Sequence, residues 1–216
     1  MEFKDLKVLK YGDIKAIFDK KKYAFFDNGI ANLNIFGVRI KTGTNVFDDA
    51  VCVAYRDDNG KPKLDTYMAT TDPGMAYLFG PLSNEGTAIL VPGQYRGAYG
   101  VHHHQGKYLA LCQRKPVAVY RDNNKDAQHD MNPLTKRSGI YGINIHRSNS
   151  KTESTYIDKW SAGCQVFKKV KDYDEFMALV TKAKNLYSNS FTYTLLEAKD
   201  FDKQKPKKEP KTKVKK

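Results

Sequence analysis

The stretch AVCVAYRDDNGKPKLDTYM, residues 50–68, decides the fold class. The apolar run at residues 50–55 is typical of a strand, and residues 63–68 form a natural return strand. Between them stands DDNG at residues 57–60, which favours a hairpin turn. We therefore predict an antiparallel β-hairpin here.

Short strand-like runs continue on both sides of this hairpin, separated by Gly and Pro. They lie at residues 33–40, 86–91, 108–112, 117–120 and 191–196. Their number and brevity predict a mainly β (α+β) fold, with the strands sharing one core.

Two helices complete the prediction. The first covers residues 12–23, with Asp13 in its first turn and Ile14, Ile17 and Phe18 at helical spacing. In the second, Asp172 and Glu175 resemble a capping-box pair. Its apolar face is predicted to hold Phe176, Leu179, Val180, Ala183 and Tyr187.

The charge of the chain is uneven. Thirty-seven Lys and Arg against 24 Asp and Glu give a net charge of +13. From Lys203 to Lys216 there are eight lysines, one glutamate and no aromatic residue. Such a segment cannot bury enough surface to order itself, so we predict a disordered Lys-rich tail at residues 202–216. It either contacts DNA, RNA or an anionic wall polymer, or only solvates the protein.

Composition also restricts the location of the protein. No apolar stretch approaches the roughly 18–20 residues that a membrane span needs. The first seven residues lack the apolar core of a secretory signal peptide. Three cysteines, Cys52, Cys112 and Cys164, do not indicate a disulfide framework. We expect synthesis in the cytoplasm, followed either by work there or by exit in a virus particle or through lysis.

The sequence with the clearest chemical content is GINIHR at residues 142–147, followed by SAGC at residues 161–164. On a strand, His146 projects from the face opposite Ile143 and Ile145, so its own pattern does not bury it. Cys164 follows a glycine, where the backbone turns tightly. A thiol needs a neighbouring base to be a useful nucleophile at neutral pH, and His146 is the candidate.

This combination resembles the catalytic domain of the L,D-transpeptidases, the YkuD-like family of peptidoglycan enzymes. The matching residues are His146, Ser161, Gly163 and Cys164. The resemblance covers about residues 68–167, reaching back to TTDPG at 70–74 and GQY at 93–95. The form that it looks most like is a phage-like variant without a signal peptide.

The resemblance implies a catalytic domain at residues 68–201. Residues 1–67 are either a separate small subdomain or part of the same domain. Cys164 would attack a peptide carbonyl in a cell-wall stem peptide and form a thioester. His146 would take the thiol proton, and N–H groups around Gly163 and Cys164 would hold the oxyanion. An amine acceptor makes a transpeptidase, and water makes a carboxypeptidase or endopeptidase; no metal or cofactor is implied.

Substrate-binding residues follow less directly. The family often carries an arginine two residues after the cysteine, where this chain has Val166. Arg147 is an alternative carboxylate ligand, because a guanidinium binds a carboxylate through two parallel hydrogen bonds. His104 and Tyr108 either line a substrate groove or form a polar turn. Trp160 either walls the active site or packs in the core.

Three other interpretations remain open. His102 and His104, with His129 or His146, could bind zinc, although no paired cysteines support this. Residues 122–130 imitate a calcium loop, but Ala127 and Pro133 replace the expected glycine and glutamate, which favours a polar turn. The third is a non-catalytic virion or wall-binding module of the same fold.

Overall fold

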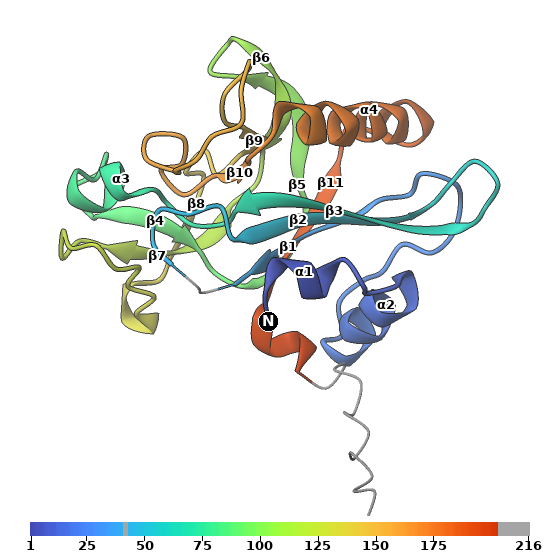
Figure 1. Ribbon diagram of the computed structural model, residues 1–216, viewed down its shortest axis with the longest axis horizontal. Helices are drawn as coiled ribbons and strands as arrows, with labels where there is room; N and C mark the ends of the chain where they lie inside the picture. The colour runs from blue at the N-terminus through green and yellow to red at the C-terminus, as the bar shows by residue number, and fades with distance from the viewer. Residues whose placement is uncertain (41–42, 203–216) are drawn as a thin grey trace, which may run out of the picture.

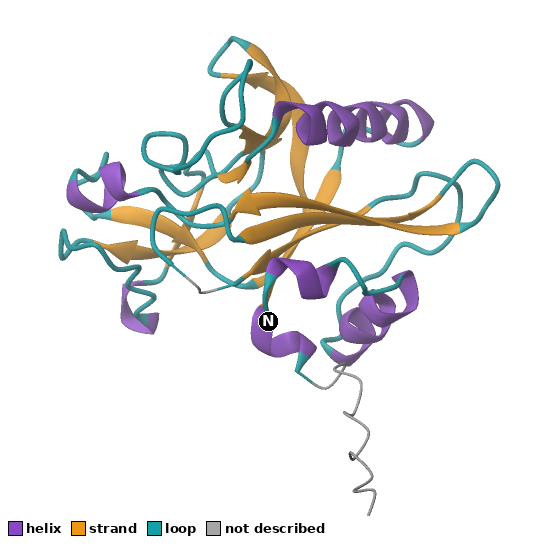
Figure 2. Cartoon of the chain, viewed as in Figure 1, coloured by secondary structure: helices purple, strands orange, loops and turns teal. Residues whose placement is uncertain are grey.

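The computed structural model describes residues 1–40 and 43–202 (Figures 1 and 2). Eight of its strands form a closed barrel. They are β1 (Asn34–Arg39), β2 (Asp49–Arg56), β3 (Pro62–Thr70), β5 (Gly93–His104), β6 (Tyr108–Gln113), β9 (Ile145–Arg147), β10 (Gln165–Phe167) and β11 (Phe191–Glu197). Their order around the barrel is β1-β11-β5-β6-β9-β10-β3-β2. The chain is therefore mainly β, as predicted.

A smaller antiparallel sheet stands beside the barrel. Its order is β4 (Thr87–Leu90), β7 (Val117–Asp122) and β8 (Arg137–Gly139). The helices are α1 (Phe3–Leu6), α2 (Tyr11–Lys20), α3 (Met75–Phe79) and α4 (Val170–Leu186), with two short 3-10 turns, η1 (Pro133–Thr135) and η2 (Ala198–Phe201).

The predicted hairpin at residues 50–68 is confirmed. Strands β2 and β3 pair antiparallel along their whole length, from Asp49 opposite Ala69 to Arg56 opposite Pro62. In the turn, Gly60 has a φ of 72°, which a glycine adopts without the steric cost of a Cβ. The Asp57 N–H donates to the Lys61 carbonyl and closes the turn.

Strands β1 and β2 are buried on both faces. Ile35 and Val53 pack into the main core with α4, whereas Phe36 and Cys52 face α2 and η2. Figure 1 shows α4 and the α1–α2 pair on opposite sides of the β1-β2-β3 sheet. Two covered faces explain the continuous apolar runs in this part of the sequence. Residues 1–67 thus supply β1, β2 and part of β3 to the same barrel as later strands.

Helix α4 differs in two details from the helix predicted around residues 172–187. It begins at Val170, and its N-cap is Lys169, so Asp172 and Glu175 do not form a capping box. Asp172 instead lies inside the first turn. Tyr187 is not on the buried face; it follows the last helical residue, is 51% exposed, and donates from its hydroxyl to the Ile30 carbonyl. The buried face holds Tyr173, Phe176, Val180 and Ala183.

The sequence patterns did not predict β5, which is 12 residues long. This strand contains Gly93, Gly97 and Gly100 and ends in three histidines, and such a composition is typical of a loop. Its order comes from pairing with β6 and β11 on either side.

Within the described residues, no helix combines the length and apolar character that a membrane span requires.

Candidate active site around Cys164

Cys164 stands at the end of a tight turn that leads into β10. The Ser161 hydroxyl accepts from the Gly163 N–H at 3.1 Å and donates to the Cys164 carbonyl at 2.8 Å. Gly163 has a φ of 122°, a conformation that side chains rarely adopt. Ser161 is fully buried and outside the cavity described below, so it shapes the turn rather than facing a ligand.

The thiol is held by two backbone groups of the segment before β9. It donates to the Gly142 carbonyl at 3.3 Å and accepts from the Asn144 N–H at 3.4 Å. Burial raises the pKa of Cys164 to about 11, because the thiolate loses solvation, and the Asn144 N–H only partly opposes this. At rest, Cys164 is therefore a neutral thiol.

His146 lies on β9, which runs parallel to β10 and pairs His146 with Val166. The histidine is only 4% exposed, although its own strand pattern does not bury it. Neighbouring side chains cover the ring, as described below. Burial lowers the pKa of His146 to about 3, because the charged imidazolium loses solvation, and the neighbouring His104 adds to this.

The hydrogen bonds of His146 fix its tautomer. Its Nδ1 lies 2.8 Å from the Arg147 carbonyl, which can only accept, so Nδ1 carries the proton. The Tyr108 hydroxyl lies 3.3 Å from both Nδ1 and that carbonyl. The lone pair is thus left on Nε2, which suits a general base. The thiol hydrogen-bonds to Gly142 and Asn144 rather than to this ring.

His104 covers one face of His146. The two rings stack with centroids 4.1 Å apart and planes 18° from parallel. Asn144 holds His104 in turn, because its side-chain amide lies 3.1 Å from His104 Nδ1. The Asn144 Oδ1 accepts from the Gln113 N–H at 2.9 Å. The contacts of Asn144 and Gln113 could not be predicted from the sequence, because they depend on the register of β6 against the segment before β9.

Cys164 and His146 line one open cavity of about 660 Å³. The predicted substrate-binding residues Arg147, His104, Tyr108 and Trp160 all line it as well. Trp160 is 41% exposed, so it lies in the wall and not in the core. The structure therefore brings together every predicted binding residue with the thiol and the imidazole.

The charged residues of this cavity are all cations. Lys107, Arg147 and Lys159 line it, and no Asp or Glu of residues 1–40 and 43–202 does. The Arg147 guanidinium lies over the Tyr108 ring at 4.1 Å, and one of its N–H groups reaches the Ser148 carbonyl at 3.5 Å. Arg147 has no carboxylate partner among the described residues. Val166 is fully buried, and its side chain does not line the cavity.

Only part of the expected oxyanion site is available. The Gly163 N–H already donates to Ser161, so it is engaged. The Cys164 N–H has no acceptor in residues 1–40 and 43–202, and it belongs to the same residue as the thiol. Of the two N–H groups expected to hold an oxyanion, that of Cys164 is the one that can do so.

The histidines proposed for zinc do not assemble. His102 contacts Arg114, and His129 donates from Nε2 to the Pro73 carbonyl at 2.9 Å. In the part of the chain that the structure describes, no three His, Cys, Asp or Glu side chains are arranged to hold a metal. In the loop that imitates a calcium site, the Asn124 amide donates to Asp126 and Asp130.

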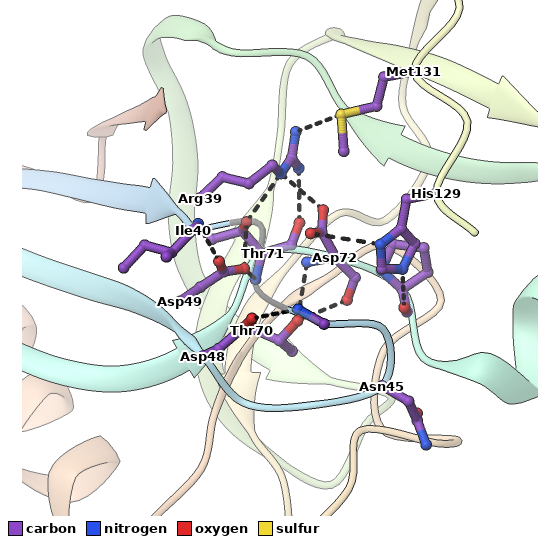
Figure 3. A network of polar contacts seen from close by, with 12 residues as sticks. Arg39, Ile40, Asn45, Asp48, Asp49, Thr70, Thr71, Asp72, His129 and Met131 are labelled. Carbon is purple, nitrogen blue, oxygen red and sulfur yellow. Dashed lines mark hydrogen bonds and ion pairs between the residues drawn. The ribbon is translucent and has the colours of Figure 1, made fainter. Parts of the chain in front are cut away.

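Figure 3 shows a polar network around Arg39, Asp49 and Asp72. Arg39, whose side chain is fully buried, lies 2.8 Å from the Asp72 carboxylate and donates to the Thr71 and Leu90 carbonyls. Asp49 accepts from the Thr71 N–H and hydroxyl at 2.7 and 2.8 Å. Burial and the Asp72 carboxylate raise the pKa of Asp49 well above its ordinary value.

This network contacts the SAGC turn through the backbone. Asp72 is followed by Pro73 and Gly74, and the Gly74 N–H donates to the Ser161 carbonyl at 2.8 Å. A Cβ on Gly74 would come within 2.1 Å of the Asp158 carbonyl oxygen, so the two segments are in direct contact. The TTDPG sequence at residues 70–74 therefore positions the SAGC turn.

Comparison with known proteins adds no further identification. Neither the family models, nor the curated proteins, nor the solved structures contain a match to this chain.

Proposed function

We propose that this protein is a cysteine acyltransferase or peptidase of the L,D-transpeptidase type, acting on stem peptides of peptidoglycan. One observation carries the proposal: the Cys164 thiol and a tautomer-fixed His146 line the same open cavity. The resemblance at His146, Ser161, Gly163 and Cys164 supplies the substrate class.

In the first half-reaction, His146 Nε2 takes the Sγ proton as the sulfur attacks the carbonyl carbon. The Cys164 N–H stabilises the oxyanion. The C–N bond then breaks, the leaving amine takes the proton from His146, and a thioester remains. In the second half, an amine or water loses a proton to His146 and attacks the thioester, and that proton returns to the sulfur.

The pKa values favour a concerted proton transfer. With Cys164 at about 11 and His146 at about 3, a preformed thiolate–imidazolium pair is unfavourable at neutral pH. The proton must then move as the substrate arrives and excludes water from the cavity. The cations Lys107, Arg147 and Lys159 favour an anionic substrate, with Arg147 as the carboxylate ligand.

The test is intact-protein mass spectrometry after incubation with muropeptides, or with a carbapenem as a thiol-reactive mimic. The wild type should gain a covalent adduct, and Cys164→Ala should not. Cys112→Ser is the matched control, because it removes a partly buried thiol outside the cavity and should leave the adduct intact. A folded wild-type protein without any adduct would refute the proposal.

The same pKa values also favour a second candidate function. A neutral thiol and a deeply buried neutral imidazole that share no hydrogen bond are compatible with a non-catalytic virion or wall-binding module. In that case Cys164→Ala should bind purified cell walls as the wild type does.

We also propose delivery inside a virus particle or through lysis. The tail from Lys203 to Lys216, predicted to contact anionic polymer or DNA, lies outside the described residues.

A further inference from the structure

His104 and Asn144 form a unit that links the thiol to the imidazole. The Asn144 backbone N–H donates to Cys164 Sγ, and its side-chain amide nitrogen contacts His104 Nδ1. His104 then stacks on His146 at 4.1 Å. One asparagine thus contacts the nucleophile directly and the base through a second ring.

The orientation of the Asn144 amide is determined by its other partner. The Gln113 backbone N–H can only donate, so the Asn144 atom 2.9 Å from it is the oxygen. The amide NH₂ therefore faces His104 Nδ1, which must accept. His104 consequently carries its proton on Nε2 and is uncharged. A second proton on Nδ1 would face an N–H donor and lose its hydrogen bond.

We infer that His104 and Asn144 are positioning residues of this site. Asn144 holds His104 as the neutral Nε2–H tautomer, and the neutral ring holds His146 in place. Only a protonated His104 lowers the His146 pKa by its charge, so the neutral tautomer removes that opposition to the imidazolium. The inference rests on the proposed role of His146 as the base for Cys164.

The groups around His104 agree with this role. From β6 and its preceding turn, Tyr108 contacts the ring at 5.5 Å, and Lys107 lies nearby. From β9 come His146 and Arg147. Burial, followed by the cations Lys107 and Arg147, lowers the pKa of His104. Among the described residues, no carboxylate is a cause of the shift in the His104 pKa, and the Asn144 amide is the group that contacts Nδ1.

The decisive variant is Asn144→Asp. It keeps the oxygen that accepts from Gln113 but replaces the amide donor with a carboxylate facing His104 Nδ1. His104 should then bind a second proton, which raises its pKa by at least about one unit. The positive charge beside His146 should oppose formation of the imidazolium. The acid limb of the pH–rate profile for acylation by a carbapenem should therefore move up by about one pH unit, with recovery of the rate at higher pH.

A double variant separates this effect from a general structural loss. His104→Phe preserves a flat ring but cannot be charged, so its own pH–rate profile is the reference for the double variant. Combined with Asn144→Asp, it should return the acid limb of the pH–rate profile toward the position of this reference. His104→Ala removes the stacked ring and should lower the rate at every pH.

Two readouts distinguish this inference from the proposed function. If the wild type is acylated, then an unshifted acid limb in Asn144→Asp, or no return in the double variant, overturns the inference alone. If the wild type is not acylated, the proposed function fails. The imidazole C–H signals in an NMR titration still test the tautomer: an unchanged His104 pKa in Asn144→Asp refutes it.

Discussion

Gly163 lies so close to Ala88 that a Cβ at Gly163 would come within 2.2 Å of the Ala88 carbonyl oxygen. This contact joins the turn that carries Cys164 to strand β4 of the smaller sheet. The position of the thiol thus depends on both sheets, and the glycine is required by space as well as by its φ of 122°.

Gly163→Ala should therefore destabilise the protein and displace Cys164. Backbone strain alone costs about 1–3 kcal/mol, and the contact with Ala88 adds to it. Urea denaturation measures the loss in the free energy of unfolding. Gly60→Ala is the matched control, because Gly60 also has a positive φ but no atom within 4 Å of its Cβ position. Equal losses in the two variants would contradict the close contact.

A second prediction concerns the buried Arg39. Arg39→Met removes the guanidinium 2.8 Å from the buried Asp72 carboxylate and leaves the His129 ring, at 3.8 Å, as its basic neighbour. Removal of one partner of such a pair costs about 3–5 kcal/mol. Thermal and urea denaturation should both show the loss. The control is Lys15→Met, which breaks the exposed pair with Asp19 and should cost less than about 1 kcal/mol. Comparable losses would mean that the buried network contributes little.

The resting protonation state of the thiol can be measured by alkylation. With a pKa of about 11, Cys164 should react with iodoacetamide faster as the pH rises through 9 and 10, with no plateau between pH 5 and 7. The adduct is located by peptide mass spectrometry, and Cys164→Ala gives the background from Cys52 and Cys112. A plateau in the acid range would instead indicate a preformed thiolate–imidazolium pair.

His146 should make the stability depend on pH. The unfolded chain binds its proton with an ordinary pKa of about 6.5, and the folded chain with one of about 3. Between these values the unfolded state holds more protons, so the free energy of unfolding falls as the pH decreases from about 6.5 to 3. The slope is at most about 1.4 kcal/mol per pH unit.

His146→Gln should remove this contribution, so its stability should fall less steeply than that of the wild type over this range. The comparison with the wild type is needed because Asp49 and Asp122, whose pKa values are raised, contribute with the opposite sign. Urea midpoints at several pH values provide the measurement. Parallel curves for the two proteins would exclude a buried neutral His146.

Much of the fold was predictable because local patterns agree with tertiary packing. The hairpin at residues 50–68 has alternating or continuous apolar runs and a strong turn, and it forms as expected. Strand β5 was not predictable, because its glycines and histidines are ordered only by neighbours on both sides. The start of α4 was misplaced because Asp172 resembles a cap but lies inside the first turn.

The candidate site, too, has features that local sequence predicts and features that depend on tertiary contacts. Cys164 and His146 could be paired from local sequence alone, and the structure brings both to one cavity. The burial of His146 could not be predicted, because it comes from His104, which lies 42 positions earlier and meets it across β6. Asn144 was visible only as one polar position in an alternating pattern, with no local signal for the three partners of its backbone N–H and side chain.

Arg147 provides the last prediction, on substrate recognition. Arg147→Lys keeps the charge but loses the planar group that lies over Tyr108 and presents paired donors. The KM for a muropeptide with a free carboxylate should rise about tenfold, while alkylation of Cys164 by neutral iodoacetamide should stay within about twofold. Arg137→Lys, at an exposed arginine outside the cavity, is the control and should change neither. If both reactions slow equally in Arg147→Lys, then Arg147 supports the fold of the site through Tyr108 and His146 and does not select a carboxylate.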